Sequence, residues 1–108
     1  MARVLKRESA KRDLIAQWVW YAENASIEIA DRFLLATENS LEALAERPGI
    51  GVACGFRSTG LETLRRFPVG EGFEKILLFY LPLSDGVDLV RILHGHRDLK
   101  TLFEEGLF

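Results

Sequence analysis

The chain has 108 residues and a formal net charge of -2, and 48% of its residues are hydrophobic and 28% charged. This composition predicts one globular domain over residues 1–108, and the negative charge argues against a general nucleic-acid binder. No apolar run approaches the roughly 20 residues of a membrane span, the N-terminus lacks the apolar segment of a signal peptide, and the single cysteine fits a reducing compartment, so we expect a cytoplasmic protein without a membrane partner.

The first half of the chain predicts a strand followed by two helices. Residues 3–6 form a short strand, and Ser9 is placed to cap a helix that runs to about Ala22. Ser26 caps the second helix, and Arg47-Pro48-Gly49 stops it. The apolar side of this helix follows helical spacing, at Ile27, Ala30, Leu34, Thr37, Leu41 and Leu44. The short link predicts that the two helices form an antiparallel hairpin.

The second half predicts a glycine-rich loop and three strands. Residues 48–62 hold four glycines without a phosphate-binding motif, so we interpret them as turn-forming residues. The strands span residues 63–69, 74–81 and 87–94, and the middle strand is apolar on both faces and therefore central. A turn at residues 82–86 joins the last two strands. The last strand is expected to alternate, with Asp88, Val90, Ile92 and His94 on one face and Val87, Leu89, Arg91 and Leu93 on the other.

The order β-α-α-β-β-β predicts an α+β fold. The N-terminal strand and the helical hairpin are expected to pack on a small antiparallel sheet, and residues from 97 to about 105 to form a short C-terminal helix. The hairpin covers one face of this sheet, and the short last helix covers the other in part. Because the central strand is apolar on both faces, we expect an exposed apolar sheet face that a second polypeptide covers.

Two histidines, His94 and His96, stand at the end of the last predicted strand. One of them, with Arg91 nearby, fits general acid–base chemistry in RNA cleavage, because the imidazole pKa lies near neutrality. The alternative is that both are ordinary hydrogen-bonding residues at a strand end. No cysteine cluster or HExxH motif accompanies them, so we expect no metal and no cofactor.

Several arginines lie on or beside the predicted strands: Arg65 shares a strand face with Phe67 and Val69, and Arg91 is flanked by leucines on its face. A half-buried guanidinium needs an acceptor. Asp88 or Asp98 could supply it within the chain, or a partner could supply a carboxylate. Both the internal ion pair and a docking site for an acidic partner or a phosphate remain open.

Aromatic residues of the first helix and the apolar end of the chain are candidate interface residues. Trp18 and Tyr21 share a helical stripe and either pack in the core or anchor a partner, and Trp20 lies about 200° away from Trp18. The last residues are unusually apolar for a chain end, with Leu102, Phe103, Leu107 and Phe108. They either pack on the sheet or contact a partner.

Four segments occur in order along residues 3–105 and carry a resemblance to a known family. Three are short: residues 9–14 after the opening strand, residues 44–49, and residues 64–69. The most specific is the strand that runs into an arginine–aspartate pair, Val90-Arg91-Ile92-Leu93-His94-Gly95-His96-Arg97-Asp98-Leu99. Together they resemble the ParE toxins of type II toxin–antitoxin (plasmid stabilisation) systems, within the RelE/ParE superfamily.

The resemblance implies two N-terminal helices packed on a small antiparallel sheet, in a bacterial toxin that a ParD-like antitoxin neutralises by wrapping around it. The usual target of the family is DNA gyrase, which these toxins poison by binding and not by an enzymatic reaction of their own. Because toxicity in the family depends on the C-terminal region, the resemblance points to Arg97, Asp98, Phe103 and Phe108 as target-binding residues. The residues expected to bind the antitoxin are Arg65, Arg91, Trp18 and Tyr21.

The related RelE-like toxins give an alternative, a ribosome-dependent mRNA endoribonuclease that would use His94, His96 and Arg91. This chain departs from that pattern, because Lys75 is the single lysine between Lys11 and Lys100 and no lysine cluster could steady a cleavage transition state. A third interpretation is an inert binding module that keeps antitoxin affinity without toxicity.

Overall fold

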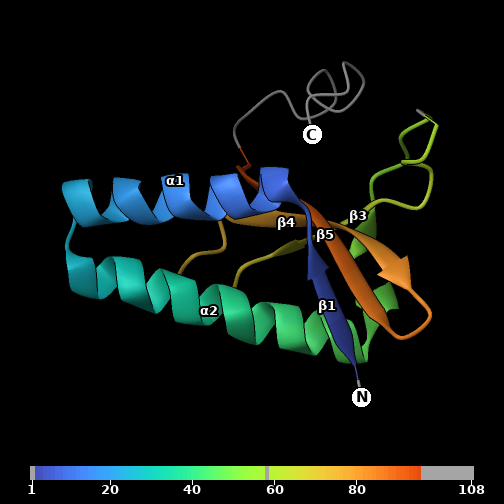
Figure 1. Ribbon diagram of the computed structural model, residues 1–108, viewed down its shortest axis with the longest axis horizontal. Coiled ribbons are helices and arrows are strands. Elements are labelled where there is room, and N and C mark those ends of the chain that lie inside the picture. Colours follow the sequence, from blue (N-terminus) through green and yellow to red (C-terminus); the bar gives the residue numbers. More distant parts are fainter. Residues whose placement is uncertain (1, 58, 96–108) are drawn as a thin grey trace.

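The computed structural model describes residues 2–57 and 59–95. Its described part is a sheet with strand order β1-β5-β4-β3-β2 and a helical hairpin packed on one face (Figure 1). The elements in chain order are β1 (Arg3–Lys6), α1 (Glu8–Asn24), α2 (Ile27–Glu46), the 3-10 turn η1 (Pro48–Ile50), β2 (Val52–Ala53), β3 (Arg65–Pro68), β4 (Ile76–Leu83) and β5 (Gly86–His94). The α+β fold class expected from the sequence is therefore confirmed.

The sheet is mixed because β1 pairs in parallel with β5. The other pairings, β2 with β3, β3 with β4 and β4 with β5, are antiparallel. β4 lies in the middle of the order, as its two apolar faces predict. The strand β2 falls in the region expected to be loop, and β4 continues through Pro82 to Leu83, so the expected turn at residues 82–86 is shorter. The C-terminal helix expected from residue 97 lies outside the described residues.

The helix boundaries follow local capping chemistry. The Ser26 hydroxyl accepts a hydrogen bond from the Ile29 amide at 3.0 Å, which confirms the predicted cap of α2. The prediction that Ser9 caps α1 is wrong, because Arg7 occupies the cap position and Ser9 lies in the first turn. The Ser9 hydroxyl instead donates to the Val90 carbonyl in β5 at 2.9 Å. A contact to another element has taken the place of a local cap.

Four of the six residues of the predicted apolar side of α2 are buried, and the other two are exposed. Ile27 is 62% exposed and Leu34 is 38% exposed. The buried residues are Ala30, Phe33, Ala36, Thr37, Ser40, Leu41, Leu44 and Ala45. Apolar residues occur around much of this helix, so spacing did not decide which of two overlapping stripes faces the sheet. The stripe with Phe33 and small neighbours is buried, because small residues allow the helix to approach the sheet closely.

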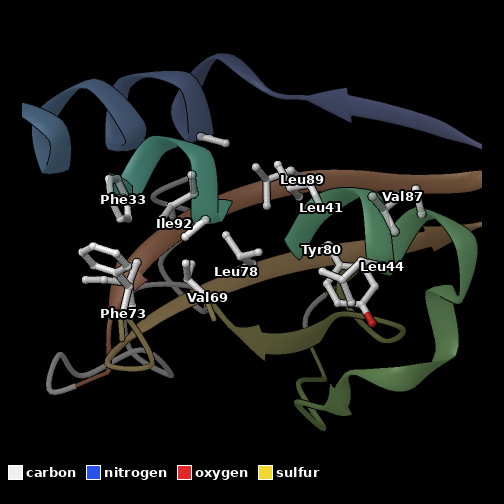
Figure 2. Close-up of a cluster of buried hydrophobic side chains, with 14 residues drawn as sticks. Phe33, Leu41, Leu44, Val69, Phe73, Leu78, Tyr80, Val87, Leu89 and Ile92 are labelled. Atoms are coloured by element: carbon white, nitrogen blue, oxygen red, sulfur yellow. The ribbon is translucent and has the colours of Figure 1, made fainter. Parts of the chain in front are cut away.

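The main core lies between the helical hairpin and the sheet (Figure 2). Its labelled residues are Phe33, Leu41 and Leu44 of α2, Val69 and Phe73 between β3 and β4, Leu78 and Tyr80 of β4, and Val87, Leu89 and Ile92 of β5. Tyr21 of α1 joins this core through Phe33 and Phe73, with ring centroids 5.2 and 5.3 Å away. The aromatic contacts tie the end of the hairpin to the sheet.

The second face of the sheet is also covered, and the expectation of an exposed apolar sheet face is wrong. Phe79, Val90 and Leu93 are buried in a second cluster with Leu61 and Leu64. Cys54, Phe56, Leu77 and Leu81 pack against it and are partly buried. The segment interpreted as turn-forming residues therefore folds back over the sheet and supplies apolar side chains. Its glycines at positions 55 and 60 adopt positive φ values, which lets the chain reverse direction.

A β-bulge interrupts the pairing of β5 with β4. Phe79 pairs with Arg91 and Tyr80 pairs with Leu89, so Val90 has no partner residue in β4. The strict alternation expected for β5 is wrong for this reason. Leu89 and Ile92, three residues apart, both face the helical hairpin, and Val90 faces the second cluster.

Tyr80 anchors the start of the segment that covers the second face. Its hydroxyl donates to the Pro48 carbonyl at 2.7 Å and accepts from the Gly51 amide at 2.9 Å. Burial raises the pKa of Tyr80, and the Gly51 hydrogen bond and Arg65 partly oppose this. Burial also raises the pKa of Tyr21. The folded chain therefore favours neutral phenols at both positions.

This preference makes stability fall at high pH. A raised pKa means that the folded chain holds the proton more tightly, so the stabilisation is complete below about pH 10 and is lost as the pH rises through the folded-state pKa. In a spectrophotometric titration, tyrosinate absorbance should appear at higher pH in the native chain than in denaturant. Because the chain has two tyrosines, Tyr80→Phe should halve the amplitude. Coincident native and denatured titration curves would contradict the burial argument.

The parallel pairing of β1 depends on a glycine at the start of β5. A β carbon at Gly86 would overlap the backbone of Arg3, whereas one at Gly49 would meet nothing within 4 Å. Gly86→Ala should therefore lower the free energy of unfolding by about 2 kcal/mol or more, because β1 must move away from β5. Gly49→Ala is the matched control and should change little. Equal denaturation midpoints for the two variants would show that β1 accommodates the methyl group.

Candidate functional site

An open groove lies where β5 ends beside α1, and it has a volume of about 990 Å³. The groove is lined by three parts of the chain: Asp13, Ala16, Gln17, Trp20 and Tyr21 of α1, Gly72 to Lys75 before β4, and Ile92, Leu93 and His94 of β5. Tyr21, Phe73 and Ile92 make part of its wall apolar. Trp20 is 54% exposed and contacts Tyr21 edge to face, with ring centroids 5.4 Å apart. Exposed tryptophans of this kind are favoured anchors for a partner.

Arg91 and Asp13 form an ion pair between β5 and α1. Arg91 Nε donates to Asp13 Oδ2 at 2.6 Å, and a second guanidinium nitrogen donates to Oδ1 at 3.0 Å. The two side chains are 13% and 15% exposed. The acceptor foreseen for Arg91 within the chain was Asp88 or Asp98. The structure shows Asp13 in this role, while Asp88 accepts from Arg7 at 3.1 Å.

Asp13 was not identified as a functional residue from the sequence. It lies in a helix among other charged residues, and its position gives no local sign that it meets a strand 78 residues further along the chain. Its carboxylate also accepts from the Ile92 amide at 3.0 Å. Ser9, one turn earlier on α1, donates to the Val90 carbonyl. The two residues share one helix face and bind β5 on both sides of Arg91.

His94 is the last residue of β5 and lines the groove. It is half-buried and pairs across the sheet with Ile76. The Gly95 amide that follows donates to the Lys75 carbonyl at 2.8 Å, which holds the end of β5 against the start of β4. The other candidates at this end of the chain lie outside the described residues: His96, Arg97, Asp98, Phe103 and Phe108.

The four residues expected to bind the antitoxin come from three elements, and the described part of the chain gives each an intramolecular contact. Arg65 on β3 donates to the Gly51 carbonyl at 2.5 Å. Trp18 Nε1 donates to Asp31 Oδ1 at 3.1 Å and links α1 to α2. Tyr21 packs in the main core, and Arg91 binds Asp13. The structure does not bring these four side chains together, and Trp20 is the more exposed tryptophan.

Most of the large exposed apolar side chains of the described residues lie on the helical hairpin, while Leu5, Ile50 and Val52 are exposed on β1, η1 and β2. Those on the hairpin are Ile15, Val19 and Trp20 on α1 and Ile27, Leu34 and Leu35 on α2. Outward-facing residues of this size on a small domain favour an interaction surface. We expected the exposed apolar surface on the sheet, because no pattern in the sequence indicates that residues 54–64 fold over it.

Neither metal binding nor membrane insertion finds support within residues 2–57 and 59–95. This part of the chain holds no cluster of three or more His, Cys, Asp or Glu residues that could bind a metal ion. It also has no helix long and apolar enough to cross a membrane. Burial raises the pKa of the Cys54 thiol, and the nearby Arg66 partly opposes this, so the described geometry does not favour a reactive thiolate.

The fold and the groove define a small α+β domain with two candidate binding surfaces. Residues 4–99 match the family described as "ParE toxin of type II toxin-antitoxin system, parDE". The match covers most of the chain, so the chain belongs to the ParE toxin family, which confirms the resemblance drawn from the sequence. No curated protein matches the chain in sequence.

A solved structure supports the same fold. The chain is similar to a protein from the "Chromosomal ParDE TA system from P. aeruginosa", with a TM-score of 0.68 and 14% sequence identity. The likeness covers 87% of this chain and 96% of that one. At this level of identity the comparison shows a shared fold.

The Arg91–Asp13 pair can be tested by a double-mutant cycle. Removing one partner leaves the other charge largely buried, so Arg91→Ala and Asp13→Ala should each lower the free energy of unfolding by about 3 kcal/mol. The double variant should lose less than the sum of the two by about 1–3 kcal/mol, because the charges are coupled. Denaturant unfolding measures all three values. Additive losses would show that the two side chains do not stabilise each other.

Proposed function

We propose that this chain is the toxin of a ParDE-type toxin–antitoxin system, that it inhibits DNA gyrase by binding, and that a ParD-like antitoxin neutralises it in the bacterial cytoplasm. The observation that carries the proposal is the family match over residues 4–99. The usual target of ParE toxins is gyrase, and their usual mode of action is a protein interface. Membership in this family favours an inhibitor over an enzyme.

The geometry near the end of β5 supports binding more than catalysis. Arg91 is the arginine that the endoribonuclease alternative would use there, and its guanidinium is held by Asp13 through two hydrogen bonds. An arginine held in this way is poorly placed to stabilise charge that develops on a phosphate in RNA cleavage. The groove beside it offers Trp20 and an apolar wall, which suit contact with a protein. We propose that Arg97, Asp98, Phe103 and Phe108 extend this surface toward the target.

The helical hairpin is the surface that best suits an antitoxin segment. Ile15, Val19 and Leu35 are exposed there, and they favour an apolar partner. Trp18 lies three residues from Ile15 on the same helix, so it can contribute to this surface from its half-buried position. Tyr21, Arg65 and Arg91 remain proposed antitoxin contacts that would act from sites where they also stabilise the toxin.

Purified gyrase provides the direct test. The chain at micromolar concentration should abolish supercoiling or trap cleaved DNA, because the toxin would stabilise a gyrase–DNA intermediate. An equimolar ParD-like antitoxin should restore supercoiling, since it would cover the toxin. Induction of the chain in bacteria should arrest growth, and co-expression of the antitoxin should relieve the arrest. Absence of arrest would favour the inert binding module.

The ribosome-dependent endoribonuclease is the second candidate, because His94 lines the groove beside Lys75. A double variant with His94→Gln and His96→Gln separates the two functions. An RNase that relies on these imidazoles should lose about 10²-fold or more of its cleavage of translated mRNA. A gyrase inhibitor needs no imidazole acid–base chemistry, so the variant should still arrest growth. Cleavage of translated mRNA together with intact supercoiling would replace the proposal with the RNase.

A further inference from the structure

We propose that Ser9 and Asp13 are positioning residues that fix the end of β5 for target binding. The inference rests on the proposed function, because it assigns these residues a role in toxicity. We call them, with residues 90–92 of β5 that they bind, the α1–β5 clamp. Asp13 also lines the groove, but the role proposed for both residues is an indirect one. They act through the strand whose end they hold.

The clamp sits at the β-bulge. A bulge leaves backbone groups without a partner in the neighbouring strand, and those groups must be satisfied elsewhere. The Val90 carbonyl receives the Ser9 hydroxyl at 2.9 Å, and the Ile92 amide donates to Asp13 at 3.0 Å. Val90 is the residue without a partner in β4, whereas Ile92 pairs with Leu78, so α1 binds β5 at the bulge and again two residues after it.

The clamp also fixes the Arg91 side chain. Two hydrogen bonds to Asp13 hold the guanidinium against α1, so residues 90 to 92 are joined to the helix through both backbone and side chain. His94 lines the groove two residues later, and the Gly95 amide is bound to Lys75. The proposed target-binding residues follow Gly95 in the sequence. The clamp therefore holds the described end of β5, within a few residues of Gly95.

The hydrophobic packing of β5 does not require the clamp. Leu89 and Ile92 are buried in the main core, and Val90 and Leu93 in the second cluster. These contacts hold the strand in the sheet. A bulge, in contrast, bends the strand and re-aims its side chains, and that bend depends on the groups that bind it. Loss of the clamp should therefore loosen the end of β5 while the strand stays in the sheet, although it also lowers the free energy of unfolding.

A matched control lies on the same two elements. Asp88 is on β5 before the bulge and accepts from Arg7, the cap residue of α1, at 3.1 Å. Asp88→Asn and Asp13→Asn each remove one carboxylate from an ion pair that joins the start of α1 to β5. The strand residues of the two pairs, Asp88 and Arg91, lie on opposite sides of Val90. If direction after the bulge matters, their effects on toxicity should differ.

The experiment compares full-length chains that carry Asp13→Asn, Ser9→Ala or Asp88→Asn. Asp13→Asn should weaken gyrase inhibition by about tenfold or more, the cost of losing a charge-assisted hydrogen bond. The affinity for the ParD-like antitoxin should fall less, because Arg91 is the one proposed antitoxin contact that binds Asp13 in the described part of the chain. Exchange of the Gly95 amide hydrogen should be faster in this variant. Ser9→Ala should act in the same direction with a smaller change, and it serves if Asp13→Asn fails to fold. Asp88→Asn should leave inhibition and Gly95 exchange near wild type.

The outcomes separate this inference from the proposed function. If the wild-type chain does not inhibit gyrase, the proposed function fails, and the role of the clamp in toxicity fails with it. If the wild type inhibits gyrase and Asp13→Asn inhibits equally well, the positioning role is overturned and the proposed function stands. Equal losses of gyrase inhibition and antitoxin affinity in Asp13→Asn, or equal losses of inhibition in Asp13→Asn and Asp88→Asn, would show a general loss of structure and also overturn it.

Discussion

The rest of the structure depends on one extra residue in β5. Val90 has no partner in β4, and this bulge shifts the side-chain alternation by one position. Leu89 and Ile92 can therefore both face the helical hairpin, while Val90 and Leu93 face the second cluster. Arg91, the residue after the bulge, binds Asp13 of α1. One strand thus contributes to two cores and to an ion pair at their edge.

The second core exists because residues 54–64 fold over the sheet. Tyr80 and Arg65 hold the start of this segment, since both form hydrogen bonds to Gly51. Leu61 and Leu64 then cover Phe79. This arrangement explains how β4 can be apolar on both faces without leaving the sheet exposed. A domain of this size gains stability when both faces of its central strand are buried.

Because the sheet is covered, the surfaces left for partners lie elsewhere. Exposed apolar residues such as Ile15 and Leu35 lie on the helical hairpin. The groove with Trp20 and His94 lies beside the end of β5. Under the proposed function, these would be separate surfaces for the antitoxin and the target, and α1 contributes to both. Changes in α1 could therefore couple neutralisation to toxicity.

The sequence by itself determined the order of the elements, the Ser26 cap, the end of α2 before Pro48, the central place of β4 and the family. These follow from short-range chemistry or from a contiguous motif, which a sequence displays directly. The tertiary structure alone decided the partner of Arg91, the bulge at Val90 and the cover of the second sheet face. Asp13 lies 78 residues from Arg91 in the sequence, and no local sequence pattern predicts a contact over such a separation. The bulge lets β5 contact two cores and helix α1, and these contacts form only when the chain packs.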